Sequence, residues 1–252
     1  MTDYLLVHGA GQGSWSWGRV WGYLTAPEEH PPRLYATRRV NEVYALDLPG
    51  HGAFADGKTA NVAVEACVNA ITEAVQKHGL HDLVLVGHGI AAPMVLQAAA
   101  RLPQPPKRVV LIAGLIPGDG QSMLAALPGH SKMAFQALTT LSKVSRQELR
   151  LPRPAIARYL CNGIDPMEVV HIVGNFGPLP TRVMKTEISL QDSRSHCPVT
   201  YVVLTQDKIL PPTLQRAMAA RLPGVQTLDL DSPHQVMLHQ PKRLAEILLR
   251  YA

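Results

Sequence analysis

The strongest constraint on the fold is an alternation along the 252-residue chain: six short apolar segments are separated by longer segments whose apolar residues fall at helical spacing. Apolar runs of about four to eight residues between turn residues are typical of strands buried on both faces of a sheet. Strands that alternate with helices predict a parallel sheet with right-handed crossovers. We therefore expect an α/β protein with a mostly parallel sheet of about six strands. The strands are expected at residues 4–8, 42–47, 82–87, 108–114, 199–205 and 225–230.

Helical spacing marks the crossover helices, which are expected at residues 15–24, 62–78, 91–101, 213–222 and 242–251. One interval breaks the rhythm, because residues 115–195 separate two expected strands and hold further helical segments. We interpret this interval as a helical cap inserted into a single domain of residues 1–252. The cap helices are expected at residues 131–141, 153–160 and 166–173. A Pro-rich segment at residues 25–41 is expected to be a surface loop.

The composition excludes several classes of protein. Hydrophobic residues make up 46% and charged residues 17%, which is the balance of a globular interior and not of a disordered chain or a coiled coil. The 24 Lys and Arg exceed the 19 Asp and Glu, but they are scattered, so no nucleic-acid partner is expected. No apolar run is long enough to span a membrane, and the N-terminus leads straight into a strand, so neither a membrane partner nor export is expected.

The cysteines favour a reducing compartment. Cys67, Cys161 and Cys197 are odd in number and lack CxxC spacing, so neither a disulfide framework nor a zinc site is expected. We expect a cytoplasmic protein with a small-molecule substrate, no metal and no cofactor. A homodimer stays open.

A glycine-rich loop, HGAGQG at residues 8–13, follows the first expected strand and precedes a helix. A dinucleotide site requires the spacing GxGxxG and an acidic residue after the second strand. Here the spacing is GxGxG, and Asp47 leads into a second turn, DLPGHG, so a nucleotide site is disfavoured. The loop resembles instead the oxyanion-hole loop of the α/β-hydrolase family, in which backbone N–H groups meet the charge that develops on a carbonyl oxygen.

The sequence LVLVGHGIAA at residues 83–92 runs from an expected strand directly into an Ala-rich helix. This arrangement matches the nucleophile elbow G-x-S-x-G, a tight turn that projects a side-chain nucleophile over the edge of the sheet. Gly89 stands at the position of the nucleophile, and Ala91 stands at the position of the last Gly. The chain thus has the turn without the hydroxyl.

Two titratable residues follow in the C-terminal part of the chain. Asp207 comes just after the strand expected at residues 199–205, and His234 lies in the loop before the last helix. A carboxylate that binds one imidazole nitrogen fixes the tautomer and leaves the other nitrogen as a base. The chain order of elbow, Asp and His is that of the α/β-hydrolase family.

Together with the DLPGHG turn, these motifs cover almost the whole chain except the cap. The sequence resembles the compact group of α/β-hydrolases that contains plant esterases and hydroxynitrile lyases, which use Ser, His and Asp on small esters or cyanohydrins. The resemblance implies that Asp207 is the orienting acid and His234 the base. It also implies that Ala10 and Ile90 supply the N–H groups of the oxyanion hole, and that Gly89 takes the place of the nucleophile.

Other residues near these motifs are alternatives. His88 is a candidate for catalysis, although histidines beside such turns more often brace loops. Asp119 follows the strand expected at residues 108–114 and is an alternative acid, ranked below Asp207. Three serines outside the elbow are disfavoured as substitute nucleophiles: Ser14, Ser16 and Ser122.

Gly89 leaves several functions open. In the favoured one, water activated by His234 attacks a small apolar ester or activated carbonyl without a covalent intermediate. In the second, His234 abstracts a substrate proton in a cofactor-independent lyase, isomerase or cyclase. In the third, the chain is a non-catalytic ligand binder. A further interpretation is an esterase inactivated by a Ser→Gly change, which restoring the serine would test.

Overall fold

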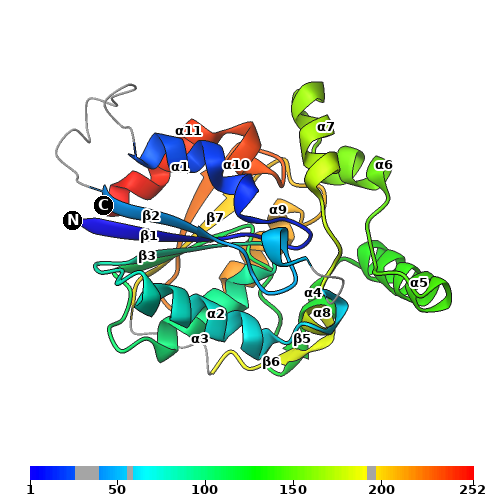
Figure 1. Ribbon diagram of the computed structural model, residues 1–252, viewed down its shortest axis with the longest axis horizontal. Coiled ribbons are helices and arrows are strands. Elements are labelled where there is room, and N and C mark those ends of the chain that lie inside the picture. Colours follow the sequence, from blue (N-terminus) through cyan, green and yellow to red (C-terminus); the bar gives the residue numbers. More distant parts are fainter. Residues whose placement is uncertain (26–39, 56–58, 192–196) are drawn as a thin grey trace.

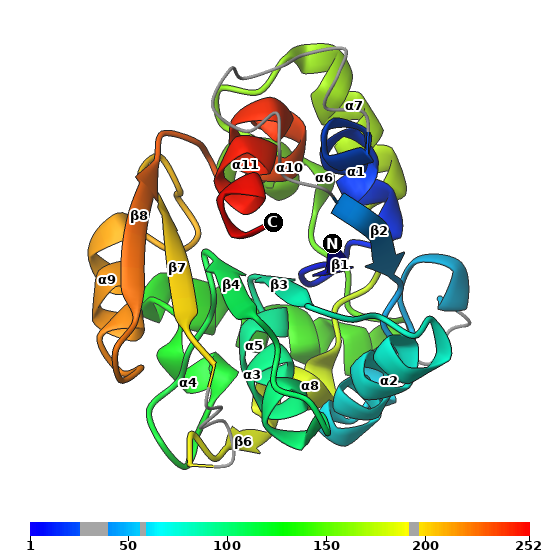
Figure 2. The same cartoon turned by 90° about the vertical axis from the view of Figure 1, so that its left-hand side faces the viewer.

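A six-stranded sheet lies at the centre of the computed structural model, which describes residues 1–25, 40–55, 59–191 and 197–252 (Figure 1). Its order is β2-β1-β3-β4-β7-β8, and each neighbouring pair is parallel (Figure 2). The predicted parallel α/β sheet is thereby confirmed. The strands are β1 Thr2–Val7, β2 Val40–Leu46, β3 Val84–His88, β4 Arg108–Ile112, β7 Val199–Leu204 and β8 Gln226–Leu230.

Helices cover both faces of the sheet, which explains why the central strands β3 and β4 are mainly apolar. In β3, Val84 and Val86 belong to the core on one face, and Leu85 between them belongs to the core on the other. Successive side chains of a strand point to opposite faces, so a strand covered on both sides has few positions for polar residues. Helices α1, α10 and α11 lie on one face, and α2 and α3 lie on the other (Figure 1).

The helices that pack on the sheet lie close to the predicted positions. The segment predicted at residues 15–24 begins with a 3₁₀ turn at Ser14–Trp17, and the segment at 242–251 ends with another at Leu249–Tyr251. The short helix α10 was not predicted. The bounds are α1 Gly18–Thr25, α2 Val64–Lys77, α3 Ala91–Arg101, α9 Pro212–Ala219, α10 Val236–His239 and α11 Pro241–Leu248.

The segment interpreted as a cap lies beyond the carboxyl ends of the strands (Figure 1). Its three expected helices coincide with α5, with α6 and the π-helical turn that follows it, and with α7. An antiparallel pair, β5 with β6, was not predicted, because strands of two residues carry no periodicity. The elements are β5 Gln121–Ser122, α4 Met123–Ala126, α5 Gly129–Ser145, α6 Arg153–Ala155, the π turn Ile156–Leu160, α7 Pro166–Asn175, α8 Thr181–Lys185 and β6 Glu187–Ile188.

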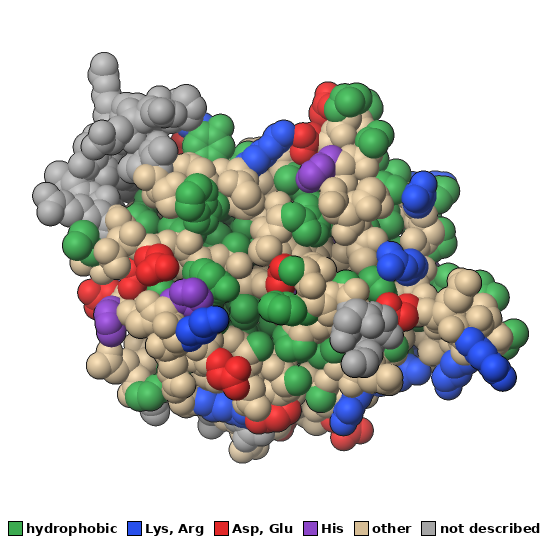
Figure 3. Space-filling view, in the orientation of Figure 1, with side chains coloured by type: hydrophobic (Ala, Val, Ile, Leu, Met, Phe, Trp, Pro, Cys, Tyr) green, Lys and Arg blue, Asp and Glu red, His purple; other side chains and the backbone are tan. Residues whose placement is uncertain are grey.

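The surface carries both signs of charge. On the face seen in Figure 3, Lys and Arg side chains are interspersed with Asp and Glu. In the described part of the chain, no helix combines the length and the apolar character needed to cross a lipid bilayer. The loop predicted at residues 25–41 lies mostly outside the described residues, which omit 26–39.

Candidate active site

The turn between β3 and α3 places Gly89 at the edge of the sheet. Gly89 has a φ of +55°, in the left-handed region that glycine adopts most easily. Its N–H donates to the carbonyl of Ile112 at 3.0 Å, and its own carbonyl accepts from the N–H of Leu115 at 2.9 Å. Both bonds are made by the backbone, so they hold the turn in place independently of the side chain at position 89.

Asp207 and His234 form a hydrogen-bonded pair above this turn. The Nδ1 atom of His234 donates to the Oδ2 atom of Asp207 at 2.7 Å, and both residues are buried. The other carboxylate oxygen, Oδ1, accepts from the backbone N–H groups of Ile209 at 2.8 Å and Leu210 at 3.0 Å. These donors orient the carboxylate, and the carboxylate in turn keeps the proton of His234 on Nδ1.

The remaining nitrogen of His234 faces position 89. Apart from atoms of Gly89 and its chain neighbours His88 and Ile90, the atom nearest to a Cβ built on Gly89 would be Nε2 of His234, at 3.7 Å. A hydroxyl on that carbon would therefore be within reach of Nε2. In this chain, the same space is open to a substrate or a water molecule.

Two backbone amides border this space. Ala10, in the loop after β1, and Ile90, the first residue after Gly89, both line the same cavity. Within the described ranges, neither N–H donates to another part of the chain. Two such N–H groups beside a base are the arrangement that stabilises an oxyanion.

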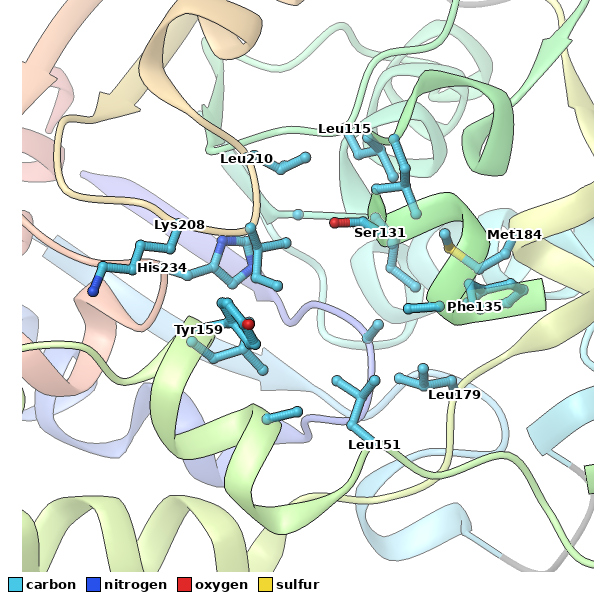
Figure 4. Close-up of a pocket in the computed structure, with 18 of the residues that line it drawn as sticks. Leu115, Ser131, Phe135, Leu151, Tyr159, Leu179, Met184, Lys208, Leu210 and His234 are labelled. Atoms are coloured by element: carbon cyan, nitrogen blue, oxygen red, sulfur yellow. The ribbon is translucent and has the colours of Figure 1, made fainter. Parts of the chain in front are cut away.

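The cavity in front of His234 has a volume of about 610 Å³ and is walled mainly by apolar side chains of the cap (Figure 4). Leu115, Leu151 and Leu179 are among these residues. The Ser131 hydroxyl points into the cavity from α5, whereas the Lys208 side chain extends away from it (Figure 4). The site therefore fits an apolar molecule with few polar groups.

Comparison with known families agrees with this geometry. The model of the alpha/beta hydrolase family matches residues 4–247. The chain belongs to this family. Its relatives include the probable esterase PIR7A of Oryza sativa subsp. indica, 25% identical over 99% of this chain and 96% of the relative. Methylesterase 7 of Arabidopsis thaliana is 24% identical over 99% of this chain and 95% of its own. The predicted resemblance to plant esterases is confirmed.

Solved structures share the fold of this α/β-hydrolase. An extracellular α/β-hydrolase from a Paenibacillus species, described as a structural and functional homologue of tobacco salicylic acid binding protein 2, aligns with a TM-score of 0.84. Its identity is 20%, over 100% of this chain and 99% of that one. Polyneuridine aldehyde esterase aligns with a TM-score of 0.73 at 15% identity, over 99% and 98% of the two chains.

A network of side chains that the sequence did not predict joins the loops of this α/β-hydrolase site. The Oε1 atom of Gln12 accepts from the N–H of Gly9 at 2.8 Å, and its Nε2 atom donates to Oε1 of Gln235. The ring of His88 contacts Oε1 of Gln12 at 3.0 Å and the carbonyl of His234 at 3.1 Å. In the sequence, the only sign of this network is that Gln12 lies in the glycine-rich loop and Gln235 directly follows His234.

A third buried glutamine supports the acid. Gln215, on α9, donates from Nε2 to Oδ2 of Asp207 at 3.2 Å and to the carbonyl of Leu210 at 2.6 Å. Its Oε1 accepts from the N–H of Leu204 at 2.9 Å. Because it lies eight residues after Asp207 on another element, no motif connects the two in sequence.

His88 lies next to the pair but has its ring nitrogens occupied. The rings of His88 and His234 are 4.6 Å apart between centroids. Burial lowers the pKa of His88 well below its usual value, and the neighbouring His234 ring lowers it further. A neutral ring with one N–H donates to only one of its two oxygen partners at a time. The geometry thus favours the bracing interpretation of His88.

The other candidates lie apart from this site. The carboxylate of Asp119 is exposed and accepts from the N–H of Leu190 at 2.8 Å. Ser16 donates to the carbonyl of Gly13, and Ser122 caps α4 by accepting from the N–H of Ala125. Across the described residues, no group of three His, Cys, Asp or Glu side chains is arranged to hold a metal ion.

Proposed function

We propose that this α/β-hydrolase cleaves esters of small apolar acids by direct attack of water, with His234 as general base and without a covalent intermediate. The observation that carries the proposal is the position of His234: Nδ1 is held by buried Asp207, and Nε2 is 3.7 Å from the point where a side chain at position 89 would begin. A base oriented in this way can activate whatever hydroxyl enters that space.

In the proposed reaction, His234 removes a proton from water while the water oxygen attacks the acyl carbon. The N–H groups of Ala10 and Ile90 receive the negative charge that forms on the carbonyl oxygen. When the bond to the leaving alkoxide breaks, the alkoxide takes the proton from Nε2. The products are a carboxylic acid and an alcohol, and His234 returns to its starting state.

The substrate class is supported by the cavity and by the relatives. The cavity of about 610 Å³ is large enough for an ester of modest size and is lined mainly by apolar side chains. The plant relatives from rice and Arabidopsis bear the names of esterases. The names favour an ester as the substrate, and the apolar lining favours an apolar ester over a charged or strongly polar one.

The test is the hydrolysis of p-nitrophenyl acetate and butyrate as a function of pH by the wild type, His234→Ala and Gly89→Ser. The wild type is expected to exceed His234→Ala by about 10² to 10⁴ in rate, which is the usual effect of a general base. Equal rates for these two proteins would overturn the proposal.

The Gly89→Ser variant distinguishes an enzyme that naturally uses water from an esterase that has lost its serine. The added Cβ meets no atom within 3.4 Å, so the variant is expected to fold despite the positive φ. If the natural reaction uses water, the serine should raise the rate by less than about tenfold. A gain of several orders of magnitude would identify an esterase scaffold that has lost its nucleophile.

A further inference from the structure

We infer that the site also transfers the acyl group directly to a small apolar alcohol, which it uses in preference to water. The inference rests on the proposed ester chemistry of the same site. The alcohol hydroxyl would occupy the space over Gly89, where His234 removes its proton.

The first argument is the polarity of this space. Apart from the flanking residues His88 and Ile90, the three atoms nearest to a Cβ built on Gly89 are Nε2 of His234 at 3.7 Å, Cα of Gly9 at 3.9 Å and Cε1 of His234 at 4.0 Å. Only one of them is polar. A water molecule held inside a protein typically makes about three hydrogen bonds, and among these three atoms it would find a single acceptor, Nε2 of His234.

An alcohol suits the same surroundings better. Its hydroxyl needs a single acceptor, Nε2 of His234, and its alkyl chain can leave water for the apolar wall. Leu115, Ile209 and Leu210 belong to that wall and lie on the loops that surround Gly89 and Asp207. Each methylene buried there should raise the preference for the alcohol by roughly threefold to fourfold.

The second argument is the absence of a side chain at position 89. In an enzyme with a serine there, the acyl group first becomes attached to the protein, and the acceptor enters afterwards. With Gly89, the acceptor and the ester must be bound together, and the acceptor oxygen takes the place of the serine oxygen. The cavity of about 610 Å³ has room for both molecules.

The reaction balances without an added oxidant or reductant. His234 takes the proton of the acceptor alcohol as its oxygen forms a bond to the acyl carbon. The bond from the acyl carbon to the original alkoxide then breaks, and that alkoxide takes the proton from Nε2. One ester and one alcohol give a new ester and a new alcohol.

The experiment supplies p-nitrophenyl butyrate and a primary alcohol to the wild type and separates the two products, butyric acid and the alkyl butyrate. Methanol, ethanol, 1-propanol and 1-butanol form the series, and tert-butanol, whose hydroxyl is crowded, is the control for solvent effects. His234→Ala and a reaction without protein set the background. Intact-mass spectra of the wild type during turnover report whether an acyl group is attached to the chain.

The expected result is a ratio of ester to acid that exceeds the ratio of alcohol to water in solution, by at least about tenfold for 1-butanol, and that rises along the series. No acyl adduct should form on the protein. Direct transfer to alcohols would be overturned if p-nitrophenol is released while the ratio of ester to acid only equals the ratio of alcohol to water in solution. An acyl adduct on the wild type would overturn it too. A wild type no faster than His234→Ala would overturn the proposed ester chemistry as well.

Discussion

The side-chain amide of Gln12 donates a hydrogen bond to the side-chain oxygen of Gln235, the residue that follows His234. Gln12 also accepts from the N–H of Gly9, next to Ala10. One side chain therefore sets the distance between the amide proposed to bind the oxyanion and the base proposed to activate the nucleophile. Errors of about 1 Å between such groups cost about 10² in rate.

The variant Gln12→Ala should lower kcat for p-nitrophenyl butyrate by about 10- to 100-fold with little change in KM, because it disturbs alignment while the apolar residues that line the cavity stay unchanged. Steady-state kinetics measure the two parameters separately. Gln240→Ala is the matched control, since Gln240 bonds the carbonyl of Asp231 outside the site. A rise in KM at constant kcat would show that Gln12 contributes to binding instead.

The variant Asp207→Asn should reduce ester turnover by about 10² to 10⁴, because the amide no longer keeps the proton of His234 on Nδ1. Asp119→Asn should leave the rate unchanged, since Asp119 is exposed and bonds Leu190. Initial rates of both variants, measured at one pH, decide between the two acids. The opposite ranking would transfer the role to Asp119.

The variant Gly11→Ala should destabilise the protein by about 2 to 4 kcal/mol, through a left-handed alanine and through overpacking. Gly11 has a φ of +68°, and an added Cβ would lie 2.2 Å from Cε1 of Phe176, whose ring packs on the loop after β1. Urea unfolding measures the loss. Gly18→Ala is the control, because a Cβ there meets nothing within 4 Å and the backbone is helical. Equal stabilities of these two variants would show that the cap does not rest on Gly11.

The free energy of unfolding should fall in acid because of His8, which is fully buried at the end of β1. Burial lowers the pKa of His8 from 6.5 to about 3, so the unfolded chain binds a proton in this range that the folded chain does not. The free energy of unfolding is therefore unaffected by this group above about pH 6.5 and decreases as the pH falls toward 3. At pH 4 the decrease is about 3 kcal/mol. Urea unfolding at pH 7 and pH 4 measures the decrease.

The variant His8→Gln should show a smaller decrease between these two pH values, because it removes the titrating ring while its oxygen can still accept from the N–H of Leu48, as Nε2 of His8 does at 3.1 Å. The exposed His130→Gln should behave as the wild type. An unchanged pH dependence in His8→Gln would assign the acid sensitivity to other groups, such as His51, whose pKa burial also lowers.

The sheet was predictable because a strand covered on both faces must be apolar throughout, as Val84 to Val86 are. The motif residues were predictable because loops at the carboxyl edge of a parallel sheet meet there. The three glutamines were not, because Gln12, Gln215 and Gln235 interact across elements and glutamine has no characteristic spacing. The pair β5 with β6 was missed because two residues form no pattern.

The hydrogen bonds of the Gly89 turn have a consequence for how the protein can evolve. The turn is held by the backbones of Ile112 and Leu115, and its left-handed glycine already has the geometry that a serine would need. Glycine codons of the type GGU or GGC become serine codons by a single nucleotide change. On the proposed mechanism, hydrolysis with and without a covalent intermediate would therefore lie one substitution apart at position 89, because backbone hydrogen bonds hold this turn whichever residue stands there.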